Sequence, residues 1–292
     1  MISTAVIMSA LELGCIYALV ALALFLSFRV LNIADMTTDG SFTLGCAVSA
    51  TVAVAGHPLL ALPAAMLAGA AAGYMTALLQ TKFCIPSILA GIITNTGLYT
   101  VNLAVMGFSS NVNMLKTETL FSMLKPILGT GYKLIPAAVI ALIAGLFLIF
   151  FLKTRLGLSI RATGDNADMV RASSINTAFT VSIGLMLANA LTALSGAVLA
   201  QYQKTADINL GTGMVIIGLA SLIIGETAFR SRKIWLKVLG AVVGCIIYRF
   251  IIAIALRLDL PSEALKLVSA VIVAVAIALP AMKKNKGGKA RC

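Results

Sequence analysis

The sequence predicts an all-α membrane protein, a polytopic transmembrane bundle of about nine helices. Its 292 residues are 60% apolar and 11% charged, a balance that a soluble domain of this length would not tolerate. Several stretches reach the length of about 20 apolar residues that a helix needs to cross a bilayer. The basic residues behind the net charge of +12 lie at the ends of these stretches, where anionic headgroups account for them, so composition argues against a nucleic-acid-binding protein.

Nine apolar stretches predict the individual helices. They cover residues 5–28, 42–56, 59–81, 87–108, 134–152, 178–202, 213–229, 238–256 and 263–282. We expect the first helix to be retained rather than cleaved as a secretory signal. The reason is that residues 1–4 carry no basic side chain, Glu12 interrupts the apolar run and no small-residue cleavage site follows.

The distribution of Lys and Arg predicts which ends of the helices face the cytoplasm. The tail after Met282 carries five basic residues, so we expect the C-terminus in the cytoplasm. Counting backward through the helices puts the N-terminus outside and divides the connections into cytoplasmic ones, 153–171 and 230–233, and outer ones, 57–58, 107–133 and 203–212. The outer loop 107–133 carries Lys116, Lys125 and Lys133, an exception that the rule allows for long loops.

Three pairs of short motifs indicate an internal repeat. Ala34-Asp35-Met36 matches Ala206-Asp207-Ile208, Gly69-x-x-x-Gly73 matches Gly240-x-x-x-Gly244, and residues 82–87 match 257–262, at offsets of 172, 171 and 175 residues. The two copies cross the membrane in opposite senses, and inverted repeats of this kind are a transporter architecture. The glycine pairs are typical of helix packing. We therefore expect one membrane domain, 1–292, comprising a repeat at 5–108, a central helix and cytoplasmic segment at 134–176, a repeat at 178–282 and a basic tail at 283–292.

Polar, glycine-bearing breaks in matching positions of the two repeats predict a translocation pathway. Residues 32–41 and 205–213 each precede a short helix, and unwound backbone at membrane depth is tolerated only where protein or water satisfies it. Amides inside apolar helices add groups that can bind a solute without buried charge. The pathway candidates are Asn32, Asp35, Thr38, Asp39, Asn95, Asn102, Asn189, Asp207 and Asn209. Two alternatives stay open: a plain loop in which Asp39 or Ser41 caps a helix, and hydrogen bonds that only hold helices together.

Two charges lie deep in the late helices. We expect Glu226, close to Arg230, to extend to the cytoplasmic face, and Arg249 to pair with a carboxylate that the sequence does not identify. No metal site is expected, because the five cysteines are scattered without a C-x-x-C pair and His57 lies beside Pro58 in a short connection.

The segment 154–176 differs from the rest by its mixed charges. Asp165 or Asn166 can cap a short helix in which Met169, Val170 and Ala172 lie among charges. Such a helix suits docking to a soluble partner, and the alternative is an interfacial helix lying on the bilayer. The sequence has no G-x-x-x-x-G-K-[S/T] motif and no Ser/His/Asp or Cys/His set, so we expect neither catalysis nor a cofactor on this chain.

Several strings of residues match a known pattern. They include Gly14-x-x-Tyr17-Ala18-Leu19, the run 28–42, and residues 96–102, 161–166 and 218–226. With them, the chain resembles over nearly its whole length the ABC importer permeases of the branched-chain amino acid and ribose superfamily, and most of all the tryptophan/tyrosine transport system permeases. It departs from that pattern at Ser173-Ser174-Ile175-Asn176, where the family usually has Leu-Gly-Ile-Asn.

The resemblance implies an ABC importer of the bacterial cell membrane, with two permease copies forming a homodimer. Two ATPase subunits would hold ATP and Mg²⁺, and an extracytoplasmic substrate-binding lipoprotein would deliver the solute, with an aromatic amino acid as the leading candidate. The segment 155–176 would be the coupling helix that enters a groove of the ATPase. Its contact residues would be Arg161, Gly164, Asp165, Asn166, Met169 and Arg171.

A secondary transporter is the rival interpretation, because such carriers also have inverted repeats. They keep intramembrane carboxylates to couple ion movement, and here only Glu12 and the acids of the two breaks qualify. A cytoplasmic docking helix would also have no role in a carrier. A membrane protein with a purely structural role is the remaining alternative.

Overall fold

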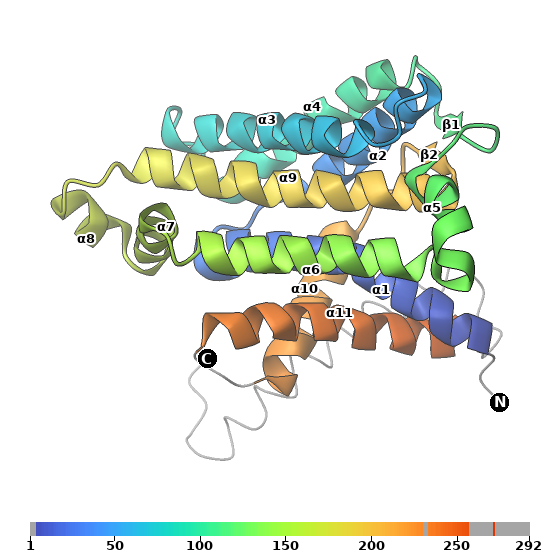
Figure 1. Cartoon of the computed structure of the whole chain (residues 1–292). Helices are drawn as coiled ribbons and strands as arrows, with labels where there is room; N and C mark the ends of the chain where they lie inside the picture. Colours follow the sequence, from blue (N-terminus) through green and yellow to red (C-terminus); the bar gives the residue numbers. More distant parts are fainter. Residues whose placement is uncertain (1–3, 230–232, 257–270, 272–292) are drawn as a thin grey trace.

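Long apolar stretches form helices because backbone inside a bilayer must satisfy its own hydrogen bonds. The computed structural model describes residues 4–229, 233–256 and 271, drawn in Figure 1. Its helices are α1 (Thr4–Leu24), which continues as the π-helix η1 (Phe25–Val30), α2 (Thr38–Val54), α3 (Ala61–Thr81), α4 (Ser87–Val105), α5 (Leu120–Leu128), the 3-10 turn η2 (Gly129–Gly131), α6 (Leu134–Phe151), α7 (Arg155–Asp165), α8 (Ala167–Ala172), α9 (Thr177–Gln203), α10 (Met214–Ala228) and α11 (Ile234–Leu256).

The predicted fold class is confirmed. Six helical stretches among the described residues are long and apolar enough to cross a membrane, as expected of a multi-pass α-helical protein. Eight of the nine predicted helices are present. The ninth, 263–282, lies outside the described residues except for Val271, as does the basic tail 283–292. The main difference is at α2, which begins at Thr38 rather than at residue 42, so that Asp39 and Ser41 belong to the helix and not to the break before it.

Two helices form the centre of the bundle. α1 packs against α6, α9, α10 and α11, while α9 packs against α2 and α3. Between Ile16 and Leu26 every side chain of the first stretch is buried, which fits a helix that is apolar on all its faces. Figure 1 shows α6, α9 and α11 running along a common direction on either side of α1.

The packing partners of the two predicted repeats follow one pattern. α3, from the first repeat, packs against α9 of the second, and α11, from the second, packs against α1 of the first. Each half therefore contributes a helix that is buried against the other half. The inverted repeat itself stays a prediction, since part of its second copy, including 257–262, lies outside the described residues.

Three elements were not predicted. α5 lies within the loop 107–133 and is started by a capping box between Thr119 and Ser122. The strands β1 (Asn111–Asn113) and β2 (Thr205–Asp207) pair antiparallel, with Val112 opposite Ala206. Strands of three residues carry too few positions for a periodic sequence signal. The pairing of β1 with β2 ties the loop 107–133 to the second break.

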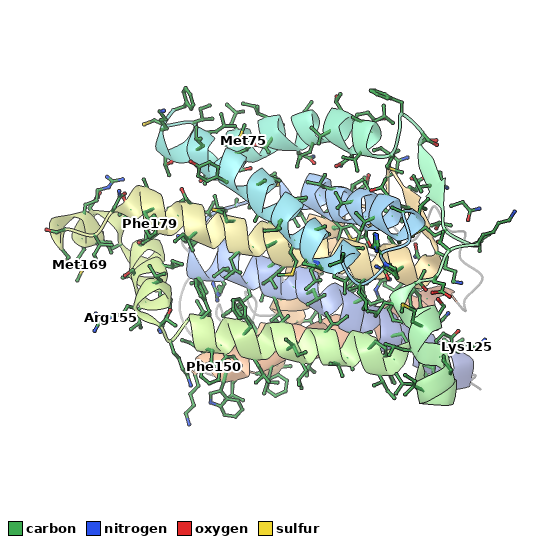
Figure 2. The ribbon with its side chains drawn as sticks, turned by 45° about the horizontal axis from the view of Figure 1, so that its top comes forward. Met75, Lys125, Phe150, Arg155, Met169 and Phe179 are labelled. Atoms are coloured by element: carbon green, nitrogen blue, oxygen red, sulfur yellow. The ribbon has the colours of Figure 1, made fainter. Side chains whose placement is uncertain are left out.

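The bundle has two distinct ends. Figure 1 shows α7 and α8 at one end and α5, β1 and β2 at the other; we call these the α7–α8 end and the α5 end. In Figure 2 the side chains of Arg155 and Met169 lie at the former and Lys125 lies at the latter. Sequence-based orientation predicts that the α7–α8 end is cytoplasmic.

The two deep charges have different partners. Glu226 of α10 forms an ion pair with Arg29 of η1, with 2.6 Å between Oε1 and Nε. The carboxylate expected to pair with Arg249 is not found among the described residues, so that expectation stays a prediction; the guanidinium lies 3.7 Å from the centre of the Tyr17 ring. An aromatic face attracts a cation through its quadrupole, so a carboxylate is not needed to hold Arg249 in place.

Small residues let the central helices approach closely, as predicted for both glycine pairs. A methyl group added at Gly73 of α3 would overlap the carbonyl oxygen of Leu185 in α9, and one added at Gly244 of α11 would overlap that of Ser221 in α10. Backbone contact of this kind takes the place of the hydrophobic effect in holding membrane helices together.

Gly73→Ala is expected to lower the free energy of unfolding by about 1–3 kcal/mol, because the added methyl group forces α3 away from α9. Gly97→Ala in α4 is the matched control, since nothing lies within 4 Å of the added methyl group. There alanine should be neutral or favourable by up to ~1 kcal/mol, because it favours helix more than glycine does. Thermal unfolding in mild detergent measures both variants, and equal melting temperatures would contradict the packing.

Candidate functional site

A cavity of about 290 Å³ lies where the two helix breaks meet α4. It is lined by Asp39, Gly40, Thr43, Asn95, Thr96, Tyr99, Asn102, Ile208, Asn209, Gly211 and Thr212. These residues come from the start of α2, one side of α4 and the loop between β2 and α10. The structure thus brings together segments from both predicted repeats and from a membrane-spanning helix, as a pathway requires.

Asp39 joins the two breaks directly. Its Oδ2 accepts a hydrogen bond of 3.0 Å from the N–H of Gly213, and its Oδ1 accepts one of 2.9 Å from the N–H of Val215. These amides belong to the start of α10, where N–H groups lack partners within the helix. The capping role left open for Asp39 is therefore real, but the helix that it caps is α10 and not its own. A negative charge at this position also complements the dipole of α10.

A second contact strengthens the same junction. The N–H of Gly211 donates to the hydroxyl of Thr43 at 3.1 Å. A side chain at position 211 would overlap the carbonyl oxygen of Asp39, so glycine is required for the loop to lie against α2. The second break therefore forms one wall of the cavity, and its backbone lies in close contact with α2.

Asn102 supplies an unsatisfied acceptor to the cavity. Its amide nitrogen donates to the carbonyl oxygen of Gly40 at 3.2 Å, which holds α4 against α2. Its Oδ1 is buried and has no hydrogen-bond partner in the part of the chain that the structure describes, where only 2% of the residue is exposed. A buried polar atom without a partner is costly, by about 1–3 kcal/mol.

The remaining lining groups are hydroxyls, the amides of Asn95 and Asn209, an aromatic ring and the apolar side chain of Ile208. Asn95, Tyr99 and Asn102 occupy one side of α4 at helical spacing, with Thr96 beside them. The Asp39 carboxylate is already engaged by backbone N–H groups. The cavity is therefore suited to a small polar molecule that is bound by hydrogen bonds and contact with a ring.

Sequence reasoning missed part of the lining. Thr43, Thr96, Tyr99 and Thr212 were not among the candidates, yet they face the cavity. For Tyr99 a signal existed, because it lies midway between Asn95 and Asn102 in the pattern i, i+4, i+7. Thr212 lies within the break 205–213 that was predicted to line the pathway, but nothing distinguished it from its neighbours there. For Thr43 no local signal existed, since only the tertiary contact between α2 and the second break places it at the cavity.

Three candidates form a separate buried network instead of lining the cavity. Asn189 of α9 donates to Oδ2 of Asp35 at 2.7 Å and accepts from the hydroxyl of Ser41 at 2.7 Å. The other carboxylate oxygen of Asp35 accepts from the N–H of Thr37, and the hydroxyl of Thr38 donates to the carbonyl oxygen of Asp35. These bonds match the alternative in which polar groups hold helices together, here the first break and α2 against α9.

Two further candidates lie outside the cavity. Asn32 is exposed and has a left-handed backbone (φ +57°), a conformation that Asn adopts more readily than most residues. Asp207 belongs to β2, where it lies opposite Asn111 and accepts from the N–H of Asn209 at 2.8 Å. Of the nine pathway candidates, Asp39, Asn95, Asn102 and Asn209 line the cavity.

The predicted docking segment forms two short helices at the α7–α8 end. The side chain of Asn166 accepts from the N–H groups of Asp168 and Met169, at 3.1 and 3.0 Å, so Asn166 and not Asp165 caps α8. Met169 is 68% exposed, whereas Val170 is buried. Arg171 forms an exposed ion pair with Asp168 at 3.3 Å. Figure 2 shows Met169 beyond the end of the long helices.

α7 is fixed to the bundle along one side. A side chain at Gly164 would overlap the carbonyl oxygen of Val30 in η1, and the hydroxyls of Thr163 and Thr180 lie 2.9 Å apart. Gly164 is therefore a packing residue, while Asp165 is exposed and Arg161 is half-buried. The exposed side chains of the segment lie on the side away from the bundle.

The departure from the family pattern has a structural counterpart. Ser174 follows α8 with a left-handed backbone (φ +60°) and donates its N–H to the carbonyl oxygen of Arg171. Glycine, the residue usual in the pattern at this position, adopts this conformation without the strain that a side chain brings. Ser174 therefore makes the left-handed turn at the end of α8 less favourable in free energy than glycine would, but the backbone still adopts that turn.

Comparison with known proteins agrees with this architecture. Residues 6–279 match the family model described as "Branched-chain amino acid transport system / permease component". A tyrosine transport system permease protein of Clostridioides difficile is 34% identical over 268 residues, which cover 91% of this chain and 88% of that protein. An uncharacterized protein of Rickettsia prowazekii is 30% identical, covering 93% and 96% of the two chains. A ribose import permease protein of Haemophilus influenzae is 21% identical, covering 93% and 83%. No solved structure matches the chain.

Asp39→Ala is expected to lower the free energy of unfolding by about 1–2 kcal/mol, because the amides at the start of α10 lose their acceptor. Asp168→Ala is the control for losing a carboxylate, since that side chain is 92% exposed and surface changes stay within about 0.5 kcal/mol. Denaturant unfolding followed by circular dichroism in detergent measures both. A loss at position 39 no larger than at position 168 would contradict the junction.

Proposed function

The chain belongs to the family of branched-chain amino acid transport system permease components, and on that premise we propose that it is the membrane-spanning subunit of an ABC importer that moves a small solute by alternating access. The permease itself is not an enzyme in this proposal. ATP and Mg²⁺ are bound by a partner chain, whose cycle of ATP binding and hydrolysis drives the two halves of the permease to rock against each other.

The observation that carries the proposal is the cavity at the junction of the two breaks. Asp39, Asn95, Asn102 and Asn209 line it, and we assign them to the pathway. Because Asp39 of one half holds the start of α10 in the other, a rocking motion would break or remake these bonds. A pathway closed by a few hydrogen bonds opens at a modest cost, of about 0.5–1.5 kcal/mol for each bond.

The exposed side of α4 supports a second copy of the chain. Thr96, Tyr99 and Thr100 are exposed there, in the interior of a membrane span. α6 offers a comparison, because its exposed residues are all apolar: Ile135, Val139, Leu142, Ile143, Leu146, Phe147 and Phe150. Polar groups facing lipid are costly. We therefore assign the α6 side to lipid and the α4 side to a homodimer that completes the pathway.

The segment α7–α8 is assigned to the ATPase partner. It carries exposed Asp165 and Met169 on a support that is fixed to η1 and α9. An exposed methionine beside charges suits insertion into a groove of a protein better than contact with water. Arg161, Asn166 and Arg171 complete the contact surface in this proposal. Gly164 supports that surface by letting α7 pack closely against η1.

An aromatic amino acid is the leading candidate for the solute. Two observations favour it: the similarity to a permease named for tyrosine transport, and a cavity that combines amides and hydroxyls with the Tyr99 ring. The buried Oδ1 of Asn102 can accept a hydrogen bond from an ammonium or hydroxyl group. An extracytoplasmic binding lipoprotein delivers the solute in this scheme, at the α5 end of the bundle.

The orientation follows the distribution of basic residues. We place the α7–α8 end and the C-terminus in the cytoplasm and the N-terminus outside, with the chain forming a single permease domain of the bacterial cell membrane. The ATPase contact and the solute delivery site then lie at opposite ends of the bundle, as alternating access requires.

Thr96→Trp is expected to reduce uptake of labelled tyrosine into vesicles to near background, because the larger ring occupies the cavity. Leu142→Trp in α6 is the matched control; that residue is 63% exposed on the side that we assign to lipid and does not line the cavity. Both variants should reach the membrane in wild-type amounts. Undiminished uptake by the Thr96 variant would exclude this cavity from the pathway, and absence of tyrosine uptake by the wild type would exclude that solute.

Asp165→Arg is expected to abolish co-purification of the ATPase and to leave the melting temperature of the permease unchanged, because the side chain is exposed. Gly164→Arg is a poorer test, since it would also disturb the packing on Val30. Glu118→Arg reverses an exposed charge at the opposite end and serves as control. Mass spectrometry of crosslinked, detergent-purified chain gives the measurement. If the wild type yields no P-loop ATPase, the importer proposal fails and uptake should be tested for dependence on an ion gradient.

A further inference from the structure

A second cavity, of about 320 Å³, lies at the α5 end and shares no lining residue with the first. Its lining includes three lysines, Lys125, Lys133 and Lys204, together with Tyr132 and Tyr202. These residues come from α5, the turn before α6 and the end of α9, so they meet only in the folded chain. The proposed function places delivery of the solute at this end of the bundle but assigns no role to the residues that line this cavity.

The lysines gather positive charge, and none of the three forms an ion pair among the described residues. Nζ of Lys133 lies 4.7 Å from the centre of the Tyr202 ring and 5.8 Å from that of Tyr132, and Nζ of Lys125 lies 5.8 Å from the centre of the Tyr132 ring. Glu12 accepts a hydrogen bond of 2.7 Å from the hydroxyl of Tyr202, and this one carboxylate stands against three lysines. The cavity is therefore prepared for an anion.

The exposed side of α5 indicates what kind of anion the cavity binds. Met123 and Ile127, four residues apart and so on one side of the helix, are 42% and 77% exposed. Figure 1 shows α5 crossing the end of the bundle rather than running along it, and Figure 2 places Lys125 at that end. A short helix that lies across the span ends with an apolar outer side is suited to the boundary between headgroups and acyl chains. Lysine and tyrosine are the residues enriched at that depth.

We propose that this cavity binds the phosphate of an anionic phospholipid headgroup, whose acyl chains lie along Met123 and Ile127. A phospholipid offers both parts, a negative group for the lysines and an apolar part for the exposed side of α5. An acidic protein surface would satisfy the lysines but would leave the apolar residues against water. The site also accounts for two of the three lysines in the loop 107–133, which are an exception to the usual bias of basic residues toward the cytoplasm.

The test uses full-length chain in mild detergent, titrated with phosphatidylglycerol or with zwitterionic phosphatidylcholine and measured by native mass spectrometry. The double variant Lys125→Gln/Lys133→Gln is expected to bind phosphatidylglycerol about 30-fold more weakly, at about fivefold for each lysine near a membrane surface. Its binding of phosphatidylcholine should not change. Lys204→Gln is expected to weaken phosphatidylglycerol binding about fivefold and provides a milder change if the double variant unfolds.

Lys82→Gln/Lys116→Gln is the matched control. It removes the same charge from two exposed lysines that do not line the cavity, and it should bind phosphatidylglycerol as the wild type does. Equal weakening by both double variants would overturn the site, because general attraction would then explain binding. Inorganic phosphate binding as tightly as the lipid would assign the cavity to free phosphate and overturn the lipid proposal. Loss of a co-purifying acidic protein with unchanged lipid binding would overturn it in favour of a protein contact.

Discussion

The backbone amides at the second helix break and the start of α10 lack partners within a helix, so side chains of α2 must supply the acceptors. Asp39 does this for Gly213 and Val215, and Thr43 does it for Gly211. Each of these acceptors belongs to the first half of the chain and each donor to the second. The same hydrogen bonds therefore satisfy the backbone amides of the break and join the two halves of the chain. The cavity exists because the helices are interrupted there, and it stays intact because the interruption is bonded across the halves.

The polar residues around α2 divide into two groups with different roles. Asp35, Ser41 and Asn189 attach the start of α2 to α9 through bonds of 2.7 Å that are fully buried. Asp39 attaches the same helix to α10. The side of α2 toward α4 has fewer such bonds, chiefly that from Asn102 to Gly40, and there the cavity opens.

Local sequence patterns predicted the fold well because a bilayer imposes simple rules of length and polarity. The start of α2 was placed too late, because Thr38, Asp39 and Ser41 look like an exposed break while they are in fact part of a helix. The partner of Asp39 lies 174 residues away, a distance at which no local pattern carries information. The same holds for Arg249, whose contact is the ring of Tyr17. In the site, the amides of α4 were recognisable by their spacing, but Thr43 was not, because only the tertiary contact brings it to the cavity.

The burial of α1 also bears on how the protein is made. This helix leaves the ribosome before α9, α10 and α11, which cover it in the folded chain. Until they arrive, α1 must remain in lipid without its partners. It can do so because its surface from Ile16 to Leu26 is apolar almost all round, so that the bilayer is a tolerable substitute for the later helices. Insertion and assembly are thereby separate events, and the order of synthesis need not match the order of packing.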